Sequence, residues 1–72
     1  MADRQNNNLL GKKIKELRLK NNLSQDELAR KADVPYTTLT KIEVGVIKKP
    51  SVFVVAKIAK ALDISLDKLI KL

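Results

Sequence analysis

The feature that most constrains the fold of this chain is a strong start signal for a short helix. Ser24 and Glu27 have the S-x-x-E spacing of a capping box. In such a box the serine hydroxyl accepts from the glutamate amide, and the glutamate carboxylate accepts from the serine amide. Leu23 and Leu28 occupy the two positions of the matching hydrophobic staple. We therefore expect a helix over residues 25–32.

A second helix is expected only a few residues later. A turn at residues 33–34 leads to Pro35, a residue favoured in the first turn of a helix. The following helix is expected over about residues 35–44, and Gly45 would end it as a C-terminal cap. Two helices joined by three or four residues form a helix-turn-helix unit. The inward residues expected from this helix are Leu39 and Ile42.

Apolar residues at helical spacing predict three more short helices. One begins near Leu10 and ends at Asn21 and Asn22, since asparagine tolerates the left-handed conformation of many helix ends. Ser51 begins another, which ends near Leu62, and Ser65 begins a short last one. The expected apolar faces of the four remaining helices contain Leu10, Ile14, Leu17, Leu28, Ala29, Ala32, Val52, Val55, Ile58, Ala59, Leu62, Leu66, Leu69 and Ile70.

No stretch of the chain alternates as a strand would. The sequence predicts an all-α protein, a compact bundle of about five short helices with a central helix-turn-helix. The chain has 72 residues, which is enough for one domain. We expect this domain to cover residues 9–72, after a polar N-terminal arm at residues 1–8 that we expect to be flexible.

Composition restricts the function. The chain has no cysteine and no histidine, so disulfides, thiolate metal sites and the commonest general base are excluded. No paired carboxylates or phosphate-binding loop are evident either, and we expect no enzyme activity, no cofactor and no metal. No apolar run reaches the roughly 18 residues of a membrane span, and the N-terminus has no apolar signal-peptide core. We expect a cytoplasmic protein that is not a membrane protein.

The charge balance favours a polyanionic partner. Fifteen lysines and arginines stand against eight acidic residues, a formal net charge of +7. The electric field of a positively charged protein attracts nucleic acids and speeds its encounter with them. The alternative is that the charge only keeps the protein soluble. Double-stranded DNA is the expected partner. RNA is less well matched, because one tyrosine and one phenylalanine give little surface for base stacking.

Several sequence motifs occur in a fixed order from residue 10 to residue 69. They are L-G-K-K-I-K-E-L-R at 10–18, L-S-Q-D-E-L-A at 23–29, T-T-L-T-K-I-E-V-G at 37–45, K-P-S at 49–51 and I-A-K-A-L-D-I-S-L-D-K-L at 58–69. This set resembles the lambda-repressor-like helix-turn-helix domains, the Cro, phage-repressor and XRE-type family. Two positions depart from the family pattern: Asp33 stands where glycine is usual, and Pro35 where serine or threonine usually caps the third helix.

The resemblance implies that the helix at about residues 35–44 enters the major groove of DNA. Its outward side chains, Tyr36, Thr37, Thr40 and Lys41, would then contact base edges. Lys41 can donate to guanine, and the threonines can offer a methyl group or a hydroxyl. The alternative is that these polar residues form an ordinary solvated face.

Further residues are expected to contact the DNA backbone, which positions a protein without identifying sequence. Related domains use a glutamine at the position of Gln25, although glutamine is also simply tolerated there. Lys48 and Lys49 lie in a loop that resembles the backbone-binding loop of the family. Thr38 either adds a phosphate contact or packs.

The resemblance also implies a structural ion pair between Arg18 and Glu43. In similar domains, an arginine late in the first helix pairs with a glutamate near the end of the recognition helix. The pair would hold the third helix against the first.

Family members commonly bind palindromic sites as two-fold dimers. We expect a homodimer through the C-terminal part of the chain, where apolar residues exceed what a small core needs. Phe53 could instead only cap the core. The expected interface residues are Phe53, Leu66, Ile70 and Leu72.

The sequence supports a transcriptional regulator resembling minimal phage repressors or restriction-modification controller proteins. The alternative is a protein-interaction module, such as an antitoxin whose main partner is a toxin. This alternative is favoured by Val44, Val46 and Ile47, which are apolar where similar domains often carry polar or basic residues. RNA polymerase is a further candidate partner.

Overall fold

The computed structural model describes residues 9–70, and these residues form five helices and no strand. The predicted arm at residues 1–8 and the predicted interface residue Leu72 lie outside the described residues. The helices are α2 (Leu9–Lys20), α3 (Gln25–Ala32), α4 (Tyr36–Val44), α5 (Val52–Ala61) and α6 (Leu66–Ile70). The all-α prediction is confirmed.

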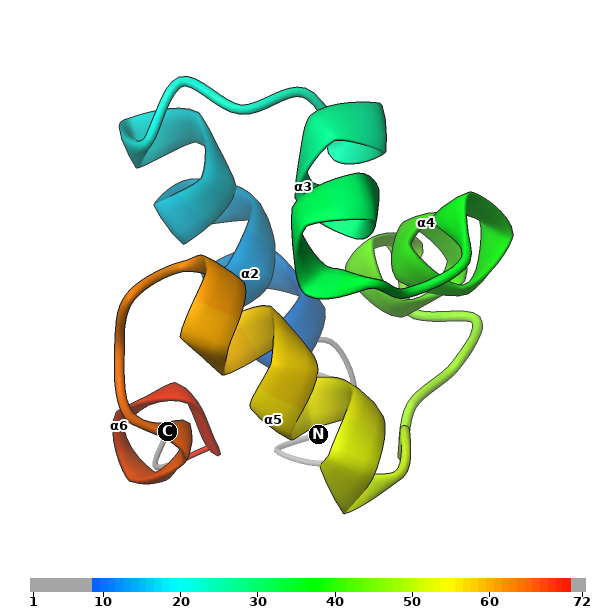
Figure 1. Ribbon diagram of the computed structural model, residues 1–72. Helices are drawn as coiled ribbons and strands as arrows, with labels where there is room; N and C mark the ends of the chain where they lie inside the picture. The colour runs from blue at the N-terminus through cyan, green and yellow to red at the C-terminus, as the bar shows by residue number, and fades with distance from the viewer. Residues whose placement is uncertain (1–8, 71–72) are drawn as a thin grey trace.

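The helices pack around one another without layers. Helix α2 packs against α4 and α6, α3 packs against α4 and α5, and α5 packs against α6. Figure 1 shows α4 at one side of the bundle and α6 at the opposite side, with α2 and α5 between them. This arrangement leaves the outer face of α4 uncovered. None of the helices in residues 9–70 is long and apolar enough to cross a membrane.

One hydrophobic core joins all five helices. Six large side chains are almost completely buried, and every helix contributes at least one of them: Ile14, Leu28, Leu39, Ile42, Ile58 and Leu69. Dispersion contacts and the removal of apolar surface from water stabilise this cluster. Leu10, Leu17 and Leu66 are partly buried and pack against its edge.

One expected inward position is wrong, because Val52 is 55% exposed. Val52 is the first residue of α5, and the face of this helix that meets the core begins one turn later, at Val55. Ile70, which was expected at an interface, is 49% exposed; it follows the buried Leu69 directly, and neighbouring residues of a helix point about 100° apart.

Tight turns end the helices at residues with positive φ. Asn22 has φ 58°, Asp33 has φ 59° and Asp63 has φ 60°. Asp33 therefore adopts the left-handed conformation for which related sequences use glycine, and its amide donates to the carbonyls of Ala29 and Arg30. Aspartate adopts this region more readily than most residues other than glycine, because its short side chain can hydrogen-bond locally.

The start of α4 differs from the prediction by one residue. Pro35 has φ −57° but ψ 139°, so it caps the helix and does not belong to its first turn. The carbonyl of Pro35 accepts from the amide of Leu39 at 3.1 Å, which is the first bond of the helix. Helix α4 therefore begins at Tyr36.

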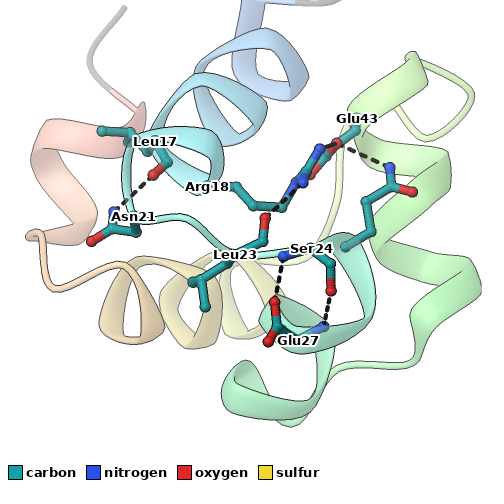
Figure 2. Close-up of polar contacts among 8 residues, drawn as sticks. Leu17, Arg18, Asn21, Leu23, Ser24, Glu27 and Glu43 are labelled. Atoms are coloured by element: carbon teal, nitrogen blue, oxygen red, sulfur yellow. Dashed lines mark hydrogen bonds and ion pairs between the residues drawn. The ribbon is translucent and has the colours of Figure 1, made fainter.

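The capping box at the start of α3 is complete. The Glu27 amide donates to Ser24 Oγ at 3.0 Å, and the Ser24 amide donates to Glu27 Oε1 at 2.8 Å, as Figure 2 shows. The bond from the Ser24 amide holds the pKa of Glu27 below its ordinary value, because it stabilises the ionised carboxylate.

The lowered pKa of Glu27 predicts a pH dependence of stability. Folding lowers this pKa, so the contribution is complete above the pKa of an unfolded glutamate, about 4.3, and disappears as the pH falls through the lower, folded value. Glu27→Gln keeps an acceptor without a titrating carboxylate. Between about pH 5 and about pH 3, its melting temperature should fall less than that of the parent. Circular dichroism melts measure both, and equal falls would contradict the assignment.

Candidate nucleic-acid interface

The outer face of α4 presents a stripe of side chains to solvent. Thr37, Lys41 and Val44 are exposed, and Thr40 is half-buried. These residues have the spacing i, i+3, i+4 and i+7, which places them on one side of a helix. Tyr36, 49% exposed, stands at the first position of α4. The structure therefore brings the four predicted base-contacting residues to the uncovered side of α4.

Val44 belongs to the same stripe, although it was not among the residues expected to contact bases. Its side chain is 66% exposed at the last position of α4, four residues after Thr40 and three after Lys41. The sequence groups Val44 with Val46 and Ile47, because all three are apolar where similar domains often carry polar or basic residues. Its spacing from Thr37 and Lys41 in the helix expected over residues 35–44 is the signal that identifies it.

The hydroxyl of Thr40 is already used within α4. Thr40 Oγ1 donates to the carbonyl of Thr37 at 2.9 Å. A threonine whose proton is bonded to its own helix can still accept a hydrogen bond or present its methyl group. Thr40 can therefore contact an exocyclic amine or a thymine methyl, and Thr37 keeps both functions of its hydroxyl.

The inner side of α4 is fixed by a buried ion pair. Arg18 Nε lies 2.8 Å from Glu43 Oε2, and Arg18 Nη2 donates to Glu43 Oε1 at 3.1 Å. The two side chains are only 8% and 2% exposed. Arg18 Nη1 also donates to the carbonyl of Leu23 at 2.8 Å. As Figure 2 shows, one guanidinium joins α2, the α2–α3 turn and α4.

Gln25 adds a third member to this network. Its Nε2 donates to Glu43 Oε1 at 3.0 Å, so that oxygen accepts from both the arginine and the amide. The first residue of α3 is thereby linked to the last turn of α4. A phosphate contact by Gln25, as expected from the family resemblance, would have to use its second N–H. Thr38, the other residue expected to contact phosphate from a helix, is half-buried.

The loop after α4 carries two exposed lysines. Gly45 ends α4 with φ 90°, a conformation that costs glycine little. The amides of Val46 and Ile47 then donate to the carbonyl of Lys41 at 2.8 and 3.0 Å. These bonds hold the start of the loop close to the helix end, while Lys48 and Lys49 remain exposed.

The segment of α4 and the following loop exposes only positively charged groups. Glu43 is the only acidic residue between residues 34 and 62, and it is buried against Arg18. Lys41, Lys48 and Lys49 therefore face solvent with no exposed carboxylate in their segment of the chain. Such a surface attracts a polyanion such as a nucleic-acid backbone.

The residues expected at a dimer interface differ in accessibility. Phe53 is 77% exposed and does not cap the core, which removes that alternative. Ile70 is also exposed, whereas Leu66 is partly buried and packs against the core. Leu66 therefore offers the least surface of the three for contact with another molecule.

The buried ion pair predicts a large effect of removing one partner. Glu43→Ala leaves the Arg18 guanidinium buried without its carboxylate and should lower the free energy of unfolding by about 3–5 kcal/mol. Glu16→Ala, which removes an exposed glutamate from α2, is the matched control and should change it by about 0.5 kcal/mol or less. Urea unfolding followed by circular dichroism measures both. Similar midpoints for the two variants would contradict a stabilising role of the pair.

Known proteins have a similar sequence and fold. A family model described as "Helix-turn-helix" matches residues 14–69. The chain is similar to SinR in a solved SinR–SinI complex, with 34% identity and a TM-score of 0.83 over 86% of this chain and 60% of that one. It is also 34% identical to SinR solved with DNA and described as the master regulator for biofilm formation. That match has a TM-score of 0.82 and covers 85% of this chain and 97% of that one. No match was found among curated proteins.

The matched segment includes α3, α4 and the ion pair between α2 and α4. The chain spans 60% of the SinR chain in the SinI complex. The family match over residues 14–69, the five-helix fold and the similarity to SinR agree with one another. The chain belongs to the lambda-repressor-like, XRE-type helix-turn-helix family of DNA-binding transcriptional regulators.

Proposed function

We propose that this protein regulates transcription by binding a palindromic double-stranded DNA operator, with α4 inserted in the major groove. It would act in the cytoplasm as a minimal repressor or a restriction-modification controller-like protein, without enzyme activity. The observation that carries the proposal is the geometry of α4. Its outer stripe is exposed, while Leu39, Ile42 and Glu43 are buried on its inner side. The similar SinR structure contains DNA. Residues 9–72 form the proposed binding domain.

Four side chains at the exposed side of α4 carry the proposed base contacts. Lys41 is the residue best suited to discriminate between bases, because a lysine donates to the O6 and N7 acceptors of guanine. Thr37 and Thr40 offer methyl groups to thymine, and Thr37 also has a free hydroxyl proton. Tyr36, at the start of α4, would place its ring against a thymine methyl or its hydroxyl at a phosphate.

Backbone contacts are proposed on both sides of α4. The second amide N–H of Gln25 would donate to a phosphate while the first remains bonded to Glu43. Lys48 and Lys49 would contact phosphates from the loop, and Thr38 would add a weaker contact. These contacts set the position of α4 in the groove and supply salt-dependent affinity.

A second copy of the chain is the proposed partner on DNA, since a palindrome presents two equivalent half-sites. A second candidate function, a protein-interaction module with a toxin or RNA polymerase as its partner, is favoured by the exposure of Val44 at 66% and Val46 at 68%. The SinR structure with SinI shows that a similar protein assembles with another protein. Co-purification of a stoichiometric partner that competes with DNA would favour this function.

The proposed roles predict different effects of two lysine substitutions. Lys41→Ala should remove the preference at one base pair, a discrimination of about 1–3 kcal/mol, when bound duplexes are selected in vitro. Lys49→Ala should weaken binding to all sequences alike and reduce the slope of log affinity against log salt by about 1. If Lys41→Ala weakens binding to all sequences equally, Lys41 contacts only phosphate and does not discriminate between bases. A parent protein that selects no consensus would contradict the proposed function.

A further inference from the structure

Val44 is an apolar side chain on the outer stripe of α4 to which the proposed DNA contacts give no role. It is 66% exposed, four residues after Thr40 and three after Lys41. It belongs neither to the hydrophobic core nor to the buried ion pair of Glu43. An exposed valine gains nothing from burial within its own chain, so its apolar contact has to come from the molecule that covers α4.

The last turn of α4 holds Val44 in place. The amides of Val46 and Ile47 donate to the carbonyl of Lys41 at 2.8 and 3.0 Å, which closes the end of the helix. The residue before Val44 is Glu43, which the buried ion pair fixes. Valine also has one strongly preferred rotamer in a helix. Its two methyl groups therefore have little freedom to lose on binding.

Thr40 extends this apolar surface by one turn. Its Oγ1 donates to the carbonyl of Thr37 at 2.9 Å, so the hydroxyl lies against the helix. The methyl group on the same β-carbon occupies another staggered position and points away from that carbonyl. Residues four apart lie on the same side of a helix, so Thr40 and Val44 present methyl groups side by side.

The major groove offers one apolar group to such a surface. The edges of the base pairs there carry hydrogen-bond donors and acceptors, and only thymine adds a methyl group, at C5 of its ring. A cytosine methylated at C5 carries the same group at the same place. Phosphates and unmethylated cytosine give a valine no favourable contact, and covering their polar atoms with it costs free energy.

We propose that Val44 is a specificity-determining residue that contacts the 5-methyl group of one pyrimidine in the half-site. This inference rests on the proposed function and specifies the DNA chemistry that is recognised. Three helical residues rise about 4.5 Å, and base pairs stack about 3.4 Å apart. The pyrimidine therefore lies within about two base pairs of the guanine that Lys41 contacts. It is thymine in unmethylated DNA, and 5-methylcytosine can replace it.

The test measures binding to a selected duplex in which the thymines are replaced one at a time by deoxyuridine. This change removes the methyl group and keeps every hydrogen-bonding group of the base. At one thymine near the guanine, the affinity of the parent should fall about 4-fold, the equivalent of ~0.8 kcal/mol for one buried methyl-sized group. Val44→Ala should show no such fall at that thymine. Fluorescence anisotropy at physiological salt measures both.

A second arm distinguishes the two sources of the methyl group. The same T·A pair is replaced by C·G, and the cytosine is then methylated at C5. Methylation should raise the affinity of the parent about 4-fold, for the same reason, and leave that of Val44→Ala unchanged. No gain on methylation would overturn the extension to 5-methylcytosine and restrict the contact to thymine.

Val46→Ala is the matched control. Val46 is a valine of similar exposure, 68%, in the loop after α4 and outside the stripe. This variant should keep the full loss of affinity on deoxyuridine substitution. Both valines lie outside the core, so both variants are expected to fold.

Three results would overturn the inference alone while the parent still selects a consensus. They are an affinity that no deoxyuridine substitution lowers, a fall that persists in Val44→Ala, and a fall that Val46→Ala also removes. A parent that selects no consensus would instead remove the proposed function, and this inference with it.

Discussion

The buried pair between Arg18 and Glu43 is the interaction on which the rest of this structure depends. An apolar core alone can pack α4 in more than one rotation, because dispersion and the hydrophobic effect are nearly non-directional. A bidentate guanidinium–carboxylate pair has a fixed geometry. Its bonds at 2.8 and 3.1 Å therefore select one orientation of α4 relative to α2. The further bonds from Gln25 and to the Leu23 carbonyl add two more elements to the same arrangement.

The pair also places the negative and the positive side chain of α4 on opposite sides of the helix. Its single carboxylate is inside the protein, where Arg18 neutralises it, and its lysine is outside. Burial of an ion pair often gives little net stability, since desolvation offsets the attraction between the charges. Here the ion pair fixes the direction in which the exposed stripe of α4 faces. It also keeps the only carboxylate of α4 away from that stripe, where it would repel phosphates. The function that we propose therefore requires Glu43 although Glu43 faces away from DNA.

Local features of the fold could be predicted from the sequence because they depend on neighbouring residues. The Ser24–Glu27 box involves groups only three residues apart, and helical spacing identified Ile14, Leu28 and Ile58 as core residues. The start of α4 was missed by one residue, because proline is compatible with both the cap and the first turn. Val52 was misplaced because periodicity does not reveal where a helix face begins to meet its neighbours.

The network at the site could be predicted only in part. The positions of Arg18 and Glu43 could be inferred from the family resemblance, whereas the bond from Gln25 to Glu43 joins residues 18 apart and depends on how α3 crosses α4. Val44 is a different case, because its place on the exposed stripe follows from the helical spacing already expected over residues 35–44. An apolar side chain at that place did not mark it as a candidate for base contact.

The most direct test of the central claim is a titration of the amide NMR spectrum with a selected duplex and with a scrambled one at physiological salt. The geometry predicts that the selected duplex shifts amides of residues 36–44, of the first turn of α3 and of residues 45–51, and leaves α6 unchanged. Shifts concentrated on α6, or equal shifts with both duplexes, would contradict a recognition helix held in place by Arg18 and Glu43.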